Sequence, residues 1–378
     1  MKKIIIVFLC FLLSGCYDYV ELNKLAIVSS IGIDKKNDLY EVSVQVMNAK
    51  EDENSNGSQV TVYSEKANTI VYALRKIALK SPRKLNGSHV SKLVLSKEVA
   101  NENIINVLDE FERLGQAREE IDLVIVDNAS AKKVLTVLTE TQNIPAEYVK
   151  NTIESGFNYT SLTTPIKADE FVSNYLKKYS DSVIPVIKII NYDKDGTTLN
   201  NIETSDPITK INVIDKLAIT KDGKVVDYIS GKEVLGYNFI NNNIKNSMIE
   251  LKCDNNNYFS VLIKSKTKYK SIKEKNKYKL SFNINVKGDI AEYNCNKELN
   301  DDNEKLEEKL KKEIKKYINK VMKYKDKSDF LGLKRKVYLD NSNYNDEKII
   351  IKTNINIDIN KKGQLNNSLK GEKNEQNR

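Results

Sequence analysis

The chain has few of the side chains on which catalytic and metal sites most often depend. Its 378 residues include one histidine, four cysteines and no tryptophan. A Ser-His-Asp or Cys-His mechanism would have to use the single histidine, His89, and a hydrogen-bonded histidine at the mouth of a strand is the simpler interpretation. No CxxC or CxxH spacing suggests zinc, and no glycine-rich phosphate motif occurs. The residues therefore offer no argument for an enzyme, although the 52 acidic residues leave a catalytic pair of carboxylates open, and we expect no metal and no cofactor.

Long hydrophobic runs are also missing. Residues 4–13 form an apolar run of ten residues, which is short of the roughly 20 that span a bilayer. The run follows Lys2 and Lys3 and leads into Leu13-Ser14-Gly15-Cys16. This order is typical of a bacterial lipoprotein signal, although an ordinary signal peptide with a chance cysteine remains an alternative. We expect residues 1–15 to be a signal peptide cleaved after Gly15. Cys16 would then be lipidated and would hold the mature chain on the outer face of the cytoplasmic membrane.

Two cysteines remain after this assignment, because Cys10 leaves with the signal peptide and Cys16 carries lipid. Cys253 and Cys295 both lie near the ends of predicted strands. An exported compartment permits a disulfide. The sequence leaves open whether these two thiols pair or stay independent.

Charge gives only a weak indication of partners. The formal net charge is +9, and it becomes +7 when Lys2 and Lys3 leave with the signal peptide. The charge is spread along the chain, without the basic stripe interleaved with aromatic residues that marks a nucleic-acid binder. We therefore expect no nucleic-acid partner and a mild bias towards an anionic membrane surface.

The first half of the chain alternates between helical and strand patterns, which predicts an α/β region with a partly parallel sheet. The predicted strands alternate apolar residues or are apolar throughout, and the predicted helices have one apolar face. The strands are 39–47, 92–96, 121–127 and 182–190, and the helices are 68–81, 101–115, 130–140 and 166–180.

The second half has a different pattern, and the polar segment 191–210 is predicted to separate the two. Strands with one apolar face are predicted at 258–270, 277–289 and 348–360, and a helix at 302–324. The helix carries an apolar stripe that would pack on this sheet or, alternatively, dock a partner helix. The predicted class is a multidomain α+β or mixed α/β protein, with an N-terminal α/β region (16–195) followed by a C-terminal antiparallel sheet packed by a long helix (205–360). Residues 361–378 are predicted to be a disordered polar tail.

Several motifs together resemble one known family. Cys16-Tyr17-Asp18, followed by Glu21 and by "LAIVSSIGID", resembles the start of the Ger(x)C family, with Tyr17 in place of the family's tryptophan. The segments "SHVSKLVLSKEVA", "KLAITKDGKVVDYISGKE" and "YKDKSDFLGL" are similar to later steps of the same family, in the same order. The resemblance extends over nearly all of residues 14–360.

This resemblance implies a non-enzymatic lipoprotein C subunit of a spore germinant receptor. It implies two partners, a large membrane subunit (A) and a multi-pass, transporter-like subunit (B), on the outer surface of the spore inner membrane. It also implies a part in nutrient-triggered germination. Cys16 is the functional residue that the resemblance transfers; Asp18 and Glu21 match the pattern, with a structural role as the simpler interpretation.

Two other functions are compatible with parts of the sequence. A solute-binding lipoprotein of a small-molecule uptake system would share the anchor and the α/β content, but such proteins have two similar lobes and only one α/β region is predicted here. An exported hydrolase would need His89, and no nucleophile motif accompanies it.

Overall fold

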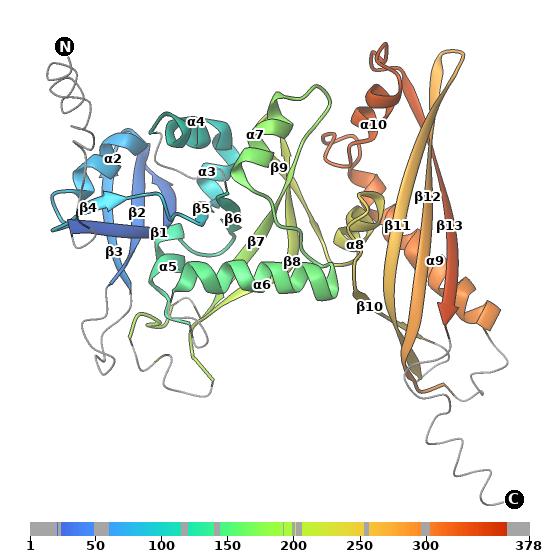
Figure 1. The fold of residues 1–378 in the computed structure, drawn as a ribbon, viewed down its shortest axis with the longest axis horizontal. Coiled ribbons are helices and arrows are strands. Elements are labelled where there is room, and N and C mark those ends of the chain that lie inside the picture. The colour runs from blue at the N-terminus through green and yellow to red at the C-terminus, as the bar shows by residue number, and fades with distance from the viewer. Residues whose placement is uncertain are drawn as a thin grey trace, which may run out of the picture.

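The computed structural model describes residues 21, 24–48, 60–114, 120–139, 144–191, 193–198, 201, 206–252, 257–295 and 303–360. Two sheets organise this part of the chain (Figure 1). The first contains all strands up to residue 230, and the second contains the four strands that follow.

The first sheet has the strand order β3-β2-β1-β5-β6-β7-β8-β9, with β4 paired to β1. Strands β1, β5, β6 and β7 run parallel to one another, and antiparallel strands flank them on both sides. This arrangement confirms the predicted mixed α/β region. The strands are β1 Leu25–Lys36, β2 Leu39–Met47, β3 Val60–Ala67, β4 Lys84–Asn86, β5 Lys92–Ser96, β6 Asp122–Val126, β7 Val183–Ile190, β8 Lys210–Lys221 and β9 Lys224–Ser230.

Helices cover both faces of this sheet. One core joins α2, α3, α4 and α7 to one face, and a second core joins α5 and α6 to the other. Strands β5 and β6 are consequently buried throughout their length, as the central strands of a covered parallel sheet should be. The helices are α2 Ile70–Ile77, α3 Lys97–Glu102, α4 Ile104–Leu114, α5 Ala131–Thr136, α6 Pro145–Thr160 and α7 Ala168–Leu176.

The polar segment 191–210 connects β7 to β8. These two strands pair antiparallel, so the first sheet continues across the segment. The domain limits predicted from the sequence remain a prediction.

The second sheet has the order β10-β11-β12-β13, and its inner face shares one core with three helices. The apolar stripe of α9 is part of that core: Leu306, Leu310 and Ile314 are all buried. The predicted packing of a long helix on the sheet is therefore confirmed. The elements are α8 Lys232–Ile240, β10 Ser247–Lys252, β11 Tyr258–Glu274, β12 Lys277–Tyr293, α9 Asn303–Val321, α10 Leu333–Asp340 and β13 Lys348–Asn360.

One feature of the predicted C-terminal sheet was wrong. The sheet is mixed and not purely antiparallel, because β12 and β13 run parallel from the pair Lys277 and Lys348 onwards. Helix α9 lies between these strands in the sequence and carries the chain back along the sheet. Strand β13 therefore enters at the same end as β12, as parallel neighbours require.

Candidate functional site

The residues that the sequence singled out are only partly in the described region. Gly15, Cys16, Asp18 and Cys253 lie outside it. Glu21 is exposed, and its carboxylate lies 3.3 Å from the Lys24 ammonium.

His89 is exposed in the turn between β4 and β5. No catalytic partner for it was predicted, and its side chain lies on the surface, outside all three hydrophobic cores.

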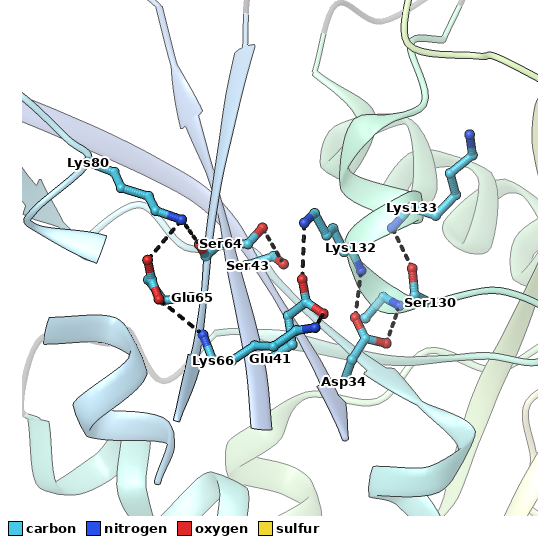
Figure 2. A network of polar contacts seen from close by, with 11 residues as sticks. Asp34, Glu41, Ser43, Ser64, Glu65, Lys66, Lys80, Ser130, Lys132 and Lys133 are labelled. Atoms are coloured by element: carbon cyan, nitrogen blue, oxygen red, sulfur yellow. Dashed lines mark hydrogen bonds and ion pairs between the residues drawn. The ribbon is translucent and has the colours of Figure 1, made fainter. Parts of the chain in front are cut away.

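The motif Gly32-Ile33-Asp34 at the end of β1 fixes the start of α5. The Asp34 carboxylate accepts hydrogen bonds from the backbone N–H groups of Ala131, at 2.7 Å, and Lys132, at 3.0 Å (Figure 2). A Cβ atom at position 32 would lie 3.1 Å from the Ala131 carbonyl carbon, so glycine permits this close approach. Burial raises the pKa of Asp34, and the two N–H groups oppose that effect.

Ion pairs extend this contact to the neighbouring strands. The Glu41 carboxylate on β2 lies 3.0 Å from the Lys132 ammonium and 3.5 Å from that of Lys66 on β3 (Figure 2). On β3, Glu65 pairs with Lys80 at 2.8 Å. Strands β1, β2, β3 and helix α5 are therefore joined by one polar network.

Replacing Asp34 by alanine is expected to lower the free energy of unfolding by about 1 to 3 kcal/mol, because two buried N–H groups lose their acceptor. Urea denaturation of the purified protein measures this. Asp34→Asn is the matched control, since its amide oxygen still accepts one of the two bonds and should cost less. Equal stabilities of wild type and Asp34→Ala would contradict the capping role.

A second network lies at the carboxyl ends of the parallel strands. Asp127, after β6, accepts from Lys216 at 2.9 Å and from Lys97 at 3.3 Å. Both ammonium groups also lie over the Tyr228 ring, 4.4 and 5.6 Å from its centroid. The lysines hold the pKa of Asp127 below its usual value, although burial opposes them. These charges are mutually satisfied and connect β6, β8, β9 and α3.

The motif around Asp329 forms the joint between the two sheets. The Asp329 N–H donates to the Asp181 carboxylate at 2.8 Å, which ties the segment before α10 to the segment before β7. The Asp329 carboxylate in turn accepts from the backbone N–H groups of Lys334 and Arg335, each at 2.9 Å. Burial raises the pKa of Asp329 to about 6, and the two N–H groups partly oppose it.

Aromatic rings complete this joint. Tyr179, from the first half of the chain, packs edge-on against Tyr338 and Tyr344 with centroid distances of 5.8 and 5.3 Å. Edge-to-face contacts of this kind add to the area they bury. The Arg335 guanidinium also donates to the Lys178 carbonyl at 3.2 Å. The motif "SDFLGL" thus positions two halves of the protein and presents no reactive group.

A buried asparagine makes a second connection between the halves. Asn238 on α8 has no exposed surface, and its amide donates to the Ser161 carbonyl at 2.8 Å. Its carbonyl oxygen accepts from the Thr164 hydroxyl at 2.8 Å. The chain that follows α6 is therefore fixed to α8 by satisfied hydrogen bonds.

Cys295, just after β12, takes part in a disulfide whose other half lies outside the described residues. A hollow of about 420 Å³ lies nearby, lined by Glu250, Tyr258, Glu292 and Asn294 among others. Small-molecule sites are mostly apolar with a few placed polar groups, and this polar, acidic lining does not fit that description.

The side chains named above stabilise the fold and connect its elements. Within the residues that the structure describes, no group of three potential metal ligands gathers. In the same part of the chain, no helix is long and apolar enough to cross a membrane.

Comparison with known proteins gives consistent matches. Residues 18–189 match the model of the spore germination protein N-terminal domain, and residues 215–368 match that of the spore germination B3/GerAC-like C-terminal domain. Residues 190–214, between the two matches, contain the segment that connects β7 to β8 and the start of β8.

Individual relatives agree with these models. Spore germination protein KC of Bacillus subtilis (strain 168) is 28% identical over 248 residues, which cover 63% of this chain and 60% of that protein. Spore germination protein A3 of the same organism is 24% identical over 307 residues, which cover 78% of this chain and 76% of that protein. The crystal structure of the GerBC protein shares the fold, with a TM-score of 0.53, 17% identity and coverage of 90% of this chain and 99% of that one.

Proposed function

Since the chain belongs to the Ger(x)C family of spore germination proteins, we propose that it acts as a lipoprotein held on the outer face of the spore inner membrane through Cys16. It is a C subunit of a spore germinant receptor, takes part in spore germination and is not an enzyme. The observation that carries the assignment is the succession of the two family models, which together cover residues 18–189 and 215–368.

The proposed anchor follows from the start of the chain. Cys16 stands two residues before the first family match and directly behind the short apolar run. A diacylglyceryl group with a further acyl chain gives stable membrane attachment, whereas a single chain gives only marginal binding. Glu21 and its neighbour Lys24 would then lie close to the lipid headgroups.

The proposed partners are the A and B membrane subunits of the same receptor, as the resemblance to the family implies. Asp18 and Glu21 are proposed to act structurally next to the anchor.

We also propose Cys253 as the disulfide partner of Cys295. Cys253 directly follows Lys252, whose β-sheet partner is Tyr258, and the Asn294 N–H donates to the Tyr258 carbonyl at 3.0 Å. Cys253 follows Lys252 and Cys295 follows Asn294 in the sequence, and both of these preceding residues pair with Tyr258. A bridge over a loop of this length stabilises by about 4 kcal/mol in the chain-entropy account.

Germination of spores that rely on this protein as their only C subunit tests the function. Spores without the gene are expected to ignore one class of nutrient and to answer a non-nutrient trigger normally. In spores carrying Cys16→Ala, the protein should leave the membrane fraction in a high-salt wash that screens electrostatic contacts, and the nutrient response should be strongly reduced, because the anchor is missing.

Immunoblots of membrane and soluble fractions provide the control for protein level. A normal nutrient response in the deletion strain would exclude the receptor role. Cys16→Ala protein that stays on the membrane through the high-salt wash with full activity would exclude the anchor while leaving the receptor role intact.

A further inference from the structure

The outer face of the second sheet gathers positive charge that the sequence disperses. Strand β11 alternates buried residues with exposed ones. Its exposed positions include lysines at four alternate positions: Lys264, Lys266, Lys268 and Lys270. Alternate residues of a strand point to the same side of a sheet, so the four ammonium groups share one face.

Strands β12 and β13 extend this face. Cross-strand pairing sets Lys287 beside Lys264 and Ser281 beside Lys270, and in the next strand Lys352 beside Ser281. At the turn between β11 and β12, Lys277 lies beside Lys348. Each row across the sheet contains one outward residue from each of β11, β12 and β13. The first row is Glu274, Lys277 and Lys348, and the last is Lys264, Lys287 and Asp358. We call the outward residues of these rows the lysine face.

The lysine face is poorly neutralised. Its six rows hold nine lysines and two carboxylates, Glu274 and Asp358. Within the described residues, the ion pair formed on this face is Lys279 with Glu274, at 3.8 Å. In the rows of Lys268 and Lys266, the β12 and β13 positions are uncharged asparagines: Asn283 bonds to Asn354 at 2.9 Å and Asn285 to Asn356 at 3.0 Å.

Nothing in the described chain covers this face. The helices of the C-terminal half share the core of the opposite, inner face, where Tyr278, Leu280 and Phe282 are buried. In Figure 1, β11, β12 and β13 stand in front of α9 on the right, with α8 and α10 on the side towards the first sheet.

The composition of the face favours a phospholipid surface over other anionic partners. Protein interfaces are depleted of lysine and enriched in arginine and aromatic residues, and nucleic-acid surfaces stack bases on aromatic rings. The lysine face has neither arginine nor an aromatic ring. Clusters of lysines near a membrane bind anionic headgroups as point charges and need no exact geometry.

One row of the face adds apolar side chains. Ile272 and Ile350 flank Lys279 and are 50% and 38% exposed. Lysines mixed with exposed aliphatic residues are typical of surfaces that rest in the headgroup region of a bilayer.

We propose that the lysine face docks the C-terminal half of the protein onto anionic phospholipid headgroups. The proposal rests on the proposed membrane location for its biological setting, but the contact itself needs no acyl chain. It would give the protein a second, electrostatic attachment at the end of the chain opposite its N-terminus.

Co-sedimentation with vesicles tests this contact. The probe is a vesicle of equal parts phosphatidylglycerol and phosphatidylcholine, compared with phosphatidylcholine alone. The chain from residue 17 is used, because it keeps every described residue and lacks Cys16. We expect binding to the anionic vesicles only, and release by salt as the charges are screened.

The four β11 lysines changed together to glutamine should weaken that binding by about 600-fold, since each lysine near an anionic surface contributes roughly fivefold. The matched control changes four exposed lysines of α9 to glutamine: Lys311, Lys312, Lys315 and Lys320. It removes the same charge and should retain most of the binding. Thermal unfolding verifies that both variants fold like the wild type.

The proposal would be overturned if the wild type bound neutral and anionic vesicles equally. It would also be overturned if the β11 variant and the α9 variant lost the same amount of vesicle binding. Absence of vesicle binding, together with a germination defect of the β11 variant, would also overturn it and would identify an acidic protein as the partner. Failure of the Cys16→Ala test would leave this result unaffected, because the vesicle assay uses no anchor.

Discussion

Replacing Asp122 by alanine is expected to lower the free energy of unfolding by about 3 to 5 kcal/mol. Asp122 on β6 lies directly beside Lys92 on β5, and its carboxylate is 2.7 Å from the Lys92 ammonium. The Lys92 side chain is only 1% exposed. Without Asp122, the protein must bury an uncompensated charge or deprotonate the lysine, and either costs free energy.

The dependence on pH distinguishes this cause from a simple packing loss. Burial lowers the pKa of Lys92, and the neighbouring Asp122 opposes that effect. Loss of Asp122 should therefore lower the folded-state pKa of Lys92 further. A lysine whose pKa is lower in the folded state binds fewer protons there, so folding becomes more favourable as pH rises towards the unfolded value. The defect of Asp122→Ala should shrink at alkaline pH.

Urea denaturation at several pH values measures both effects. The double variant Lys92→Met/Asp122→Leu removes both charges and should be close to wild type, because apolar residues can replace a buried pair. Asp109→Ala removes the partner of Arg113 in an exposed pair and should cost less than about 1 kcal/mol. A pH-independent loss in Asp122→Ala would contradict the buried-charge explanation.

Replacing Gly236 by alanine is expected to destabilise the C-terminal half by about 3 kcal/mol or more. A Cβ atom at this position would lie 2.3 Å from the Tyr317 carbonyl oxygen and 3.0 Å from a methyl carbon of Val321. Helices α8 and α9 would have to separate, and overpacking of a buried contact usually costs 1 to 3 kcal/mol. The obstructing atom is backbone, which cannot rotate away as a side chain does.

Gly156→Ala supplies the matched control, because Gly156 also lies inside a helix, α6. Its added Cβ would meet a side-chain methyl of Thr163 at 3.1 Å. That methyl can shift, and alanine is about 1 kcal/mol better than glycine in a helix. The two substitutions should therefore differ in sign or by several kcal/mol in thermal or urea unfolding. Similar effects at both positions would show that the α8–α9 contact tolerates a side chain.

The secondary structure was predictable wherever the apolar pattern was strong. Strands β2, β5, β6 and β13 and helix α9 follow directly from their periodicity. Helix α6 was missed, since only Ala146, Val149 and Ile153 mark its buried face, although Pro145 at its start was a usable signal. Strand β10 was also missed; its alternation covers only six residues.

The polar networks were less predictable than the motifs that contain them. The segments that contain Asp34 and Asp329 were recognised as family features, but the capping roles of these two aspartates depend on residues about 100 and 5 positions away. The contact of Asp181 with Asp329 joins positions 148 apart in the sequence. No local pattern contains such information.

Local order along the chain was enough to identify the family and most helices and strands, and it is also the basis on which a lipoprotein start is predicted. The tertiary structure decided the parallel pairing of β12 with β13, the buried pair of Lys92 with Asp122 and the gathering of lysines on one face. The lysines are dispersed along the sequence. The pairing of β11 with β12, and of β12 with β13, places their outward residues on one surface. Charge density on a surface is a property of that pairing, since strand register alone sets which side chains become neighbours.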